Sequence, residues 1–219
     1  DKKGKGKKQV WFTARAHSGE VTGSFVLEGI VRNILADPKI LQKADFYFVP
    51  FVDTDGVWLG YYGKNREPRD FNRDYCLDPI RPEIDAILKA VRSKSSGRVD
   101  YSFDLHAPTP GGPVYLVPPK LSIISEDEWR EYCKFAATLE EFSPESCPAT
   151  FSEFLRRARP AAMNWTNANY DMTNTTFFYR AYGALSFILE TAYHRGEGMS
   201  GKVLEPDDWR KLGHGLTEA

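Results

Sequence analysis

The sequence predicts an α/β protein with a single open sheet covered by helices on both faces. Three observations lead to this fold class. Apolar runs of strand length recur along the 219 residues, and amphipathic stretches with helical spacing lie between them. Polar residues capable of chemistry directly follow several of the apolar runs. Because ligands in such sheets bind beyond the carboxyl ends of the strands, these polar residues are the first candidates for a functional site.

Composition excludes several other classes of protein. Hydrophobic residues make up 42% and charged residues 27% of the chain, which is ordinary for a globular domain and rules out a wholly disordered one. Lys and Arg number 29 against 30 Asp and Glu, so the charge balance gives no reason to expect a nucleic-acid partner. No apolar run approaches the roughly 20 residues of a membrane span. Three cysteines without a Cys-x-x-Cys pair argue against a disulfide framework or a cysteine zinc site, and they leave the compartment open.

The first elements are expected within a single domain that covers residues 1–219. Residues 1–9, rich in lysine and glycine, are expected to form a loop or a frayed terminus, and residues 10–16 a buried strand. The glycine-lysine stretch resembles a hairpin turn whose first strand is missing, so we expect the chain to be a fragment of something longer. Helical spacing of apolar residues over 20–36 predicts a helix, which ends at the Asp-Pro pair that follows it.

The middle of the chain alternates strands, helices and one conspicuous loop. Residues 46–52 and 99–105 have the apolar character of buried strands. Between them, residues 53–75 are dense in Gly, Asn, Asp, Arg and Tyr, which predicts a long loop of the kind that carries function. A helix is expected to begin at Pro82, because proline suits the first turn of a helix.

The last third continues the same alternation. The expected elements are a short strand at 114–117, helices at 126–142 and 151–158, a polar and aromatic loop at 164–183, a buried strand at 185–189 and a terminal helix at 207–212. Since polar residues follow the predicted strands at His17, Asp53, His106 and Glu190, we expect these four side chains to gather at one edge of the sheet.

Three side chains in this part of the sequence could together hold a metal ion. His17 and Glu20 are three residues apart and can close on one ion as the chain turns into a helix, with His106 as a third ligand. Zinc takes nitrogen and oxygen ligands, and a catalytic zinc site has three protein ligands and an open position. The spacing alone does not select this pair, because His194 and Glu197 repeat it.

Two further positions could act on a substrate. Arg73, in the segment 70–73, offers a planar fork that grips a carboxylate through two hydrogen bonds, although a surface salt bridge is the simpler interpretation. Glu190 follows a buried strand, where a carboxylate beside a metal site can accept a proton from water and pass it on. Its simpler interpretation is an ion pair with Arg180 or Arg195.

Together, these motifs resemble the M14 family of zinc carboxypeptidases. The segments that carry the resemblance, in the family's order, are 15–20 (Arg-Ala-His-Ser-Gly-Glu), 53–57 (Asp-Thr-Asp-Gly-Val), 70–73 (Asp-Phe-Asn-Arg), 104–106 (Asp-Leu-His) and Glu190. The stretch 60–63 (Gly-Tyr-Tyr-Gly) is similar to one found in the cytosolic-carboxypeptidase-like and bacterial branches. The resemblance implies a mixed sheet of the zinc-carboxypeptidase type.

The resemblance also implies roles for individual residues. One Zn²⁺ per chain would be held by His17, Glu20 and His106, since the second His-x-x-Glu copy has no counterpart in the family. Glu190 would be the general base. Asp70 would orient the first of these histidines.

Other roles follow from the same resemblance. Asn72 and Arg73 would hold the terminal carboxylate of the substrate. The arginine that polarises the scissile carbonyl is assigned to Arg66, although Lys64 and Arg69 lie nearby. The mobile tyrosine of the family is assigned to Tyr170, with Tyr179 as second choice.

The function expected from the sequence is therefore a zinc metallocarboxypeptidase. It would release C-terminal residues from peptides that end in a free carboxylate. Two alternatives stay open: a zinc amidohydrolase acting on N-acyl amino acids or cell-wall peptides, and a peptide-binding pseudo-enzyme that has lost turnover. The preferred side chain, the oligomeric state and the compartment are not determined by the sequence.

Overall fold

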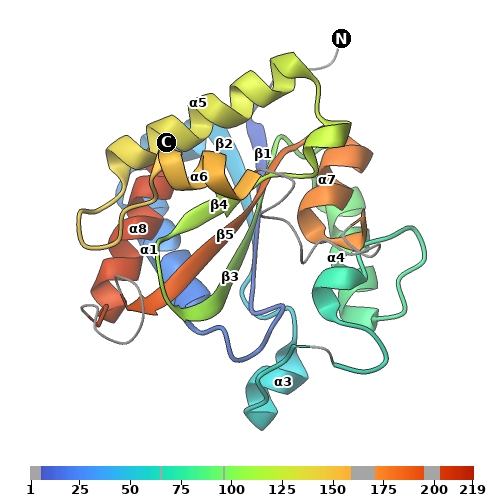
Figure 1. The fold of residues 1–219 in the computed structure, drawn as a ribbon. Coiled ribbons are helices and arrows are strands. Elements are labelled where there is room, and N and C mark those ends of the chain that lie inside the picture. The colour runs from blue at the N-terminus through green and yellow to red at the C-terminus, as the bar shows by residue number, and fades with distance from the viewer. Residues whose placement is uncertain (1–5, 65, 96, 159–170, 195–202) are drawn as a thin grey trace.

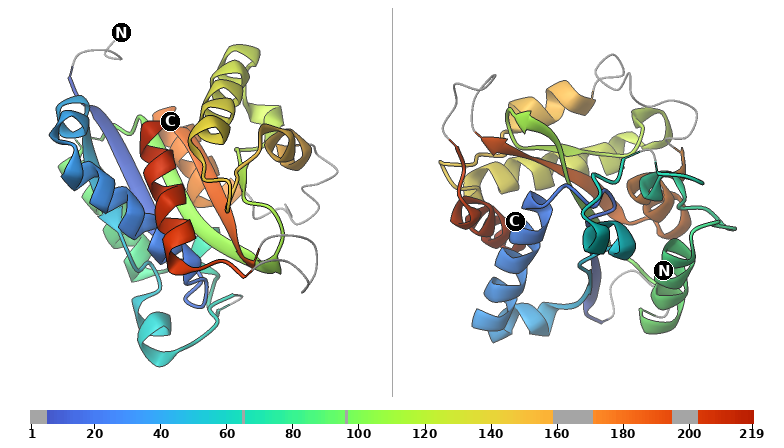
Figure 2. Two further views of the ribbon diagram at one scale, coloured as in Figure 1. Left: turned by 90° about the vertical axis from the view of Figure 1, so that its left-hand side faces the viewer. Right: turned by 90° about the horizontal axis from the view of Figure 1, so that it is seen from below.

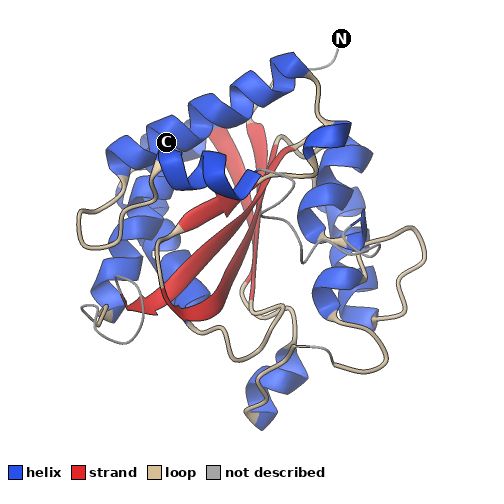
Figure 3. Ribbon diagram, viewed as in Figure 1, coloured by secondary structure: helices blue, strands red, loops and turns tan. Residues whose placement is uncertain are grey.

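The computed structural model describes residues 6–64, 66–95, 97–158, 171–194 and 203–219. In this part of the chain, one sheet of five strands lies between layers of helices (Figures 1 and 3). The strands are β1 (Lys8–Ala14), β2 (Ala44–Val49), β3 (Tyr101–Gly111), β4 (Tyr115–Val117) and β5 (Leu185–His194). Their spatial order is β2-β1-β3-β5-β4, with β4 antiparallel to β5 and the other pairs parallel. The predicted α/β class with a single mixed sheet is confirmed.

Eight α-helices and two short 3₁₀ turns connect the strands within the described residues. They are α1 (Thr22–Ala36), α2 (Pro38–Lys43), α3 (Thr54–Leu59), η1 (Phe71–Arg73), α4 (Pro82–Lys94), η2 (Leu121–Ile123), α5 (Glu126–Phe142), α6 (Phe151–Ala158), α7 (Asn174–Tyr182) and α8 (Pro206–Glu218). Helices α5 and α6 have the predicted bounds. None of the helices described is long and apolar enough to cross a membrane.

Helices cover both faces of the sheet because successive strand residues point to opposite sides. Phe12 and its neighbours on alternate positions face α1, α5, α6 and α8, where they form the larger core. Trp11, one residue earlier, faces α4 and α7 and belongs to a second core. Figure 2 shows the two helical layers from other directions. The covered faces leave the strand ends as the place where polar side chains from several strands can meet.

The first strand departs from the sequence prediction in two ways. Residues 1–9 were expected to be loop, but β1 begins at Lys8, because Lys8 pairs with Ala44 and Gln9 pairs with Asp45. A hairpin partner was expected beside this strand. That arrangement is wrong, because both edges of β1 are occupied, by β2 and by β3.

Two segments predicted as loops contain helices. The segment 53–75 includes α3 and η1, and the described part of 164–183 includes α7. Helix α7 begins where the Thr173 side chain accepts a hydrogen bond from the Thr176 backbone amide, and it ends at Gly183 in the left-handed region. Its first turn is polar and yet buried. The apolar periodicity by which a helix is recognised is therefore absent there.

The central strands are longer than predicted, and this matters for the site. The strand expected to stop at residue 105 continues to Gly111, and the one expected to stop at 189 continues to His194. His106 and Glu190 therefore lie within β3 and β5, where they are direct neighbours in the register. The pairing is interrupted by an irregularity between His106 and Thr109. Helix α8 is also longer than the expected 207–212, and Pro38 begins the unpredicted α2.

The contact between α1 and α8 is close enough to depend on glycine. A Cβ atom at Gly213 would lie 2.1 Å from the carbonyl oxygen of Val26. We therefore expect Gly213→Ala to lower the free energy of unfolding by about 1–3 kcal/mol, since the helices must separate to admit the methyl group. Urea unfolding measures the change. Lys211→Ala, at an exposed position of the same helix, is the control and should shift stability by less than about 0.5 kcal/mol. Equal effects of the two changes would contradict the close contact.

Candidate metal centre and active site

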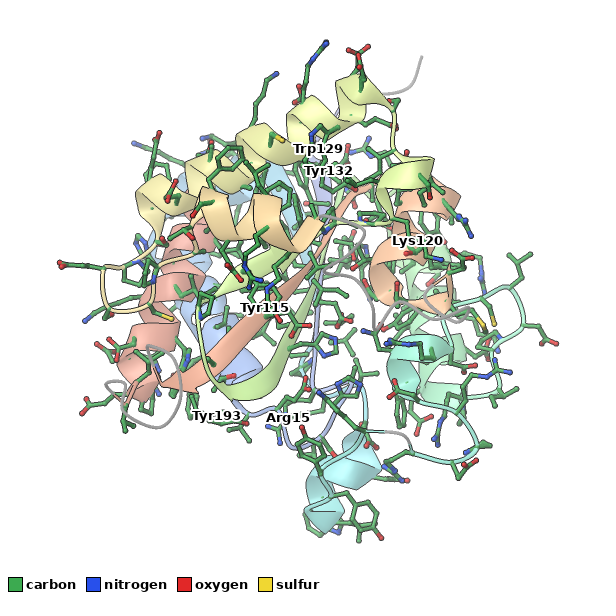
Figure 4. The ribbon with its side chains drawn as sticks, viewed as in Figure 1. Arg15, Tyr115, Lys120, Trp129, Tyr132 and Tyr193 are labelled. Carbon is green, nitrogen blue, oxygen red and sulfur yellow. The ribbon has the colours of Figure 1, made fainter. Side chains whose placement is uncertain are left out.

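The turn after β1 is held in place by two side chains. Arg15 adopts a left-handed backbone conformation with φ 61°, and its guanidinium Nε donates to the carbonyl oxygen of Ser18 at 2.7 Å. The hydroxyl of Tyr193, on β5, donates to the carbonyl oxygen of Gly19 at 3.0 Å. Figure 4 labels Arg15 and Tyr193 at this end of the sheet. A strained conformation that persists needs such support, and here it fixes the segment that carries two of the predicted ligands.

The structure brings the three predicted ligands together. Nδ1 of His17 lies 3.0 Å from Oε1 of Glu20, and Nδ1 of His106 lies 2.8 Å from Oε2 of the same carboxylate. The two Nδ1 atoms are 3.2 Å apart. All three side chains are buried, and their ligand atoms lie within 4.8 Å of one another. Side chains separated by up to 89 positions in the chain thus converge on one point.

The other ring nitrogen of each histidine faces a carboxylate. Nε2 of His17 lies 3.2 Å from Oδ2 of Asp70, and Nε2 of His106 lies 2.7 Å from Oδ2 of Asp104. A carboxylate only accepts, so each Nε2 carries the proton and donates it, which leaves both Nδ1 atoms to bind a cation. Asp104 also accepts from the Thr13 hydroxyl at 2.7 Å. The sequence analysis gave Asp104 no role, although a charged residue inside an apolar strand was the available signal.

The electrostatics of the cluster favour a bound cation. Burial opposes the ionisation of Glu20, but the two imidazoles more than offset it and hold the pKa of that carboxyl well below its ordinary value. Burial would likewise lower the pKa of His17 and of His106, but the carboxylates around them raise both. Without a metal, protons thus supply the positive charge that the buried carboxylates demand. Two imidazole nitrogens and one carboxylate form a donor set that fits zinc in a site with an open position.

Asn72 lies behind a ligand, and its amide oxygen is bound inside the protein. Its Nδ2 is 3.1 Å from Nε2 of His106, and its Oδ1 accepts from the backbone amide of Asn174 at 3.0 Å. The residue is 3% exposed, and its amide oxygen joins it to the first turn of α7. Arg73 is half-buried, and its Nη1 donates to the carbonyl oxygen of Asn72 at 2.7 Å.

Two of the candidate cations of the segment 64–69 are bound elsewhere. Arg66, to which the sequence analysis assigned the carbonyl-polarising role, forms an ion pair with the buried Asp53, which also caps α3. Arg69 forms an ion pair with the buried Asp74 at 2.7 Å.

Lys64 is placed differently from these two arginines. Its Nζ lies 3.2 Å from Oε1 of Glu20, so the ammonium group touches the proposed ligand cluster. Burial would lower the pKa of Lys64, but the charge of Glu20 outweighs it and raises that pKa. The sequence analysis named Lys64 only as a neighbour, because spacing cannot tell which of three nearby cations turns inward.

Glu190 is a buried carboxyl beside the cluster. It is 8% exposed, and its Oε2 has no hydrogen-bond partner among the described residues. Burial raises its pKa to about 7. A carboxyl that gains and loses a proton near neutral pH is suited to general acid–base work. In the antiparallel pairing of β4 with β5, Tyr115 lies opposite Glu190. Figure 4 labels Tyr115.

Only one of the two tyrosines proposed for the mobile role lies among the described residues. Tyr170 lies outside the described residues, so its role stays a prediction. Tyr179, the second choice, donates its hydroxyl to the carbonyl oxygen of Ile123 at 2.8 Å and lies 2.8 Å from Glu128. Its hydroxyl is thus engaged with η2 and α5.

Comparison with known proteins shows that part of the chain is similar to zinc carboxypeptidases. Residues 1–81 match the sequence model of the zinc carboxypeptidase family M14. Cytosolic carboxypeptidase 2 of Xenopus tropicalis is 40% identical over 73 residues, which is 32% of this chain and 8% of that protein. The chain therefore spans only a small part of this curated relative.

Solved structures share the fold over nearly the whole chain. A metallo-carboxypeptidase from Burkholderia cenocepacia superposes with a TM-score of 0.76 at 20% identity, covering 99% of this chain and 57% of that one. A metallo-carboxypeptidase from Pseudomonas aeruginosa, in complex with (2-guanidinoethylmercapto)succinic acid, gives a TM-score of 0.74 at 19% identity, covering 97% and 56%. The chain spans little more than half of each. These comparisons confirm the predicted resemblance in family and in fold.

The cluster predicts metal-dependent stability. We expect Zn²⁺ to stabilise the protein by about 3 kcal/mol at a free concentration 100 times its dissociation constant, because the ion binds only the folded cluster. Thermal unfolding with and without a chelator measures this. His106→Ala should abolish the gain and the tight binding. His214→Ala, at an exposed position of α8, is the matched control and should keep both. Full zinc binding by His106→Ala would show that the ion is held elsewhere.

Glu190 predicts a pH dependence in the metal-free protein. Its folded pKa of about 7 lies above its ordinary value of 4.5. The folded state therefore binds more protons than the unfolded state between these two values. Its contribution to stability is present below pH 4.5 and is lost as the pH rises through 7. We expect Glu190→Gln to be more stable than the parent above pH 7, by about 1–3 kcal/mol, and to differ less near pH 4.5. Chemical unfolding across this range measures the difference, and a constant one would contradict the raised pKa.

Proposed function

The chain is related to the M14 zinc carboxypeptidases, and from this premise we propose that the protein is a zinc-dependent metallocarboxypeptidase. It hydrolyses the C-terminal peptide bond of peptides that end in a free carboxylate. The convergence of His17, Glu20 and His106, with the buried Glu190 on the adjacent strand, is the observation that carries the proposal. Residues 1–219 are proposed to form a single catalytic domain, since the described elements build one sheet.

One zinc ion per chain would be held by His17, Glu20 and His106. When bound, zinc supplies a Lewis acid and lowers the pKa of its water to roughly 7. The chain's own part is to hold the ligands in a fixed arrangement. Asp70 and Asp104 do this by accepting hydrogen bonds from the outward ring nitrogens, which orients both imidazoles and strengthens them as ligands.

Glu190 moves the proton during hydrolysis. As the water oxygen bonds to the carbonyl carbon, the Glu190 carboxylate accepts the proton that the water loses. As the carbon–nitrogen bond breaks, the carboxyl gives this proton to the nitrogen of the leaving amine. A side-chain carboxyl whose pKa lies near 7 is suited to both directions of transfer. The products are a free amino acid and a peptide shortened by one residue.

Arg73 is proposed to bind the terminal carboxylate of the substrate. It directly follows Asn72, which touches His106, so its backbone lies beside the cluster. A half-buried guanidinium offers several N–H donors in one plane, and one of them is used by the carbonyl oxygen of Asn72. Asn72, which the sequence analysis paired with Arg73, is proposed to bind the same carboxylate through its Nδ2, because its Oδ1 already accepts from the backbone amide of Asn174.

The two alternatives from the sequence analysis make different predictions. A zinc amidohydrolase would cleave N-acyl amino acids or cell-wall peptides faster than unmodified peptides. A pseudo-enzyme would bind zinc and peptide without releasing an amino acid. A panel of unmodified peptides, amidated peptides, N-acyl amino acids and muropeptides separates the three, because amidation removes the carboxylate that Arg73 would bind.

Removing the proton carrier tests the mechanism. We expect Glu190→Gln to lower kcat by about 10²–10⁴, since general acid–base catalysis contributes a factor of this size. Amino-acid release from free-acid peptides measures kcat, and metal analysis should show the zinc content of the parent. Thr191→Ser, the next residue along β5, is the control for changes in the strand and should retain turnover. A Glu190→Gln protein that turns over normally would sink the assignment, and so would a zinc-loaded parent that acts on none of the panel.

A further inference from the structure

The geometry points to Thr191 as a positioning residue of the metal centre, acting through a chain of hydroxyl groups that runs from Thr22 to the backbone of His106. The inference rests on the proposed function and adds residues that contact neither the metal nor the substrate. It starts from two contacts. The Thr191 hydroxyl donates to the carbonyl oxygen of His106 at 2.9 Å, and the hydroxyl oxygens of Thr22 and Thr191 lie 2.5 Å apart.

The chemistry of the groups fixes the direction of both hydrogen bonds. A carbonyl oxygen only accepts, so the Thr191 hydroxyl gives its single proton to His106. The Thr22 hydroxyl therefore donates its own proton to the oxygen of Thr191. The exposed fractions of the two threonines are 0% and 1%, so both bonds are shielded from solvent.

The bonded carbonyl lies where the pairing of β3 with β5 is irregular. From His106 to Thr109, β3 advances by three residues, whereas β5 advances by two from Glu190 to Ala192. An extra residue bends a strand and disrupts the ladder of hydrogen bonds, and it can re-aim a side chain. The backbone that follows His106 therefore lacks the regular ladder that holds the rest of β3, and side chains hold it instead.

The peptide group between His106 and Ala107 is bound at both of its ends. Its carbonyl oxygen accepts from Thr191, and its N–H donates to Oε2 of Glu20 at 3.1 Å. Because a peptide group is planar, holding its oxygen also sets the direction of its N–H. The same Oε2 lies 2.8 Å from Nδ1 of His106. A rotation of this one peptide group would therefore displace two proposed metal ligands from each other.

Close packing brings the two threonines together. Helix α1 begins two residues after Glu20, and a Cβ atom at Gly23 would lie 2.9 Å from the carbonyl oxygen of Leu105. The first turn of α1 is thus packed directly against β3, one residue before His106. This approach places the Thr22 hydroxyl within reach of β5.

Strand β5 serves the site from both of its faces. Successive side chains of a strand point to opposite sides, so Thr191 faces α1 while Glu190 faces the side of the sheet that carries the ligand cluster. The hydroxyl chain therefore joins the three elements that carry Glu20, His106 and Glu190. A partner that orients a metal ligand from behind affects metal affinity without touching the ion.

Removing the hydroxyl of Thr191 tests the inference. Thr191→Val keeps the branched shape, and we expect its affinity for zinc alone to fall by about 10–100-fold, the usual effect of losing a partner behind a metal ligand. Competition with a chelating indicator measures this affinity. Thr191→Ser, which keeps the hydroxyl, should bind zinc as the parent does. Parental zinc affinity in folded Thr191→Val would overturn the inference.

Thr175→Val is the matched control. Thr175 is 0% exposed, and its hydroxyl has no hydrogen-bond partner among the described residues, so the same chemical change is made at another buried site. We expect this variant to keep the zinc affinity of the parent. If it loses as much as Thr191→Val, the effect belongs to any buried threonine and the inference is overturned.

A double variant tests the chain itself. Thr22 reaches His106 only through Thr191, so Thr22→Val should weaken zinc binding less than Thr191→Val does. The double variant Thr22→Val/Thr191→Val should then bind zinc as Thr191→Val does, whereas fully additive losses would show that the two residues act separately. Where Thr191→Val does not fold, Thr22→Val decides. A loss of zinc affinity that Thr22→Ser restores supports the chain, and parental affinity overturns it.

The outcome for the proposed function is read separately. If the parent binds zinc but releases no amino acid from any substrate, the proposed function fails, and the zinc affinities still decide about Thr191. If the parent binds no zinc, hydrogen exchange of the Ala107 amide in the metal-free protein decides instead. We expect this amide to exchange about tenfold faster in Thr191→Val, because its hydrogen bond to Glu20 is loosened. An exchange rate equal to the parent's would overturn the inference.

Discussion

A buried negative charge organises this protein. Glu20 is 1% exposed, accepts the backbone amide of Ala107 at 3.1 Å, and is surrounded by His17, His106 and Lys64. An isolated carboxylate in such a place would cost more free energy than a domain can spare, so positive charge has to be brought to it from several elements. The same need suits the cluster to a metal ion, because a divalent cation would satisfy the carboxylate and both imidazoles at once.

A buried hydrogen-bond network connects the ligand cluster to the elements around it. Thr13 donates to Asp104, and Asn174 donates to the hydroxyl oxygen of Thr13 at 3.2 Å, while Ser102 donates to Asn174 at 3.0 Å. Strands β1 and β3 and the first turn of α7 are thereby linked to the orientation of His106. Buried polar groups are tolerated when each has a partner, and a satisfied network of this kind holds a site rigidly. It gives Asn174 in the polar first turn of α7 its buried partners, whereas the Thr175 hydroxyl there has none among the described residues.

The loop before α4 is held in place by the side chain of Arg81. Arg81 donates to the carbonyl oxygens of Arg66, Glu67 and Arg69, and its guanidinium lies 4.3 Å from the centroid of the Phe71 ring. One side chain thus gathers the backbone of a segment that has little regular structure. This anchoring leaves the preceding residues free to pack against the turn that carries the ligands, where Gly63 permits the close approach. The position of Lys64 is a consequence of both contacts.

The sequence by itself determined the alternation of strands and helices and the bounds of α5 and α6, because periodicity and helix signals are local properties. The order of its motifs predicted that His17, Glu20 and His106 come together, and the structure brings them together. It did not determine the partners of Lys64, Arg66 and Asn72. Three cations within six residues are equivalent in spacing, and only the packing of the loop against the turn decides which one meets the cluster. The first turn of α7 and the extensions of β3 and β5 were missed for a related reason. Several of their polar side chains, such as Asn174 and Thr191, have partners far away in the chain, and only the folded structure brings those partners near.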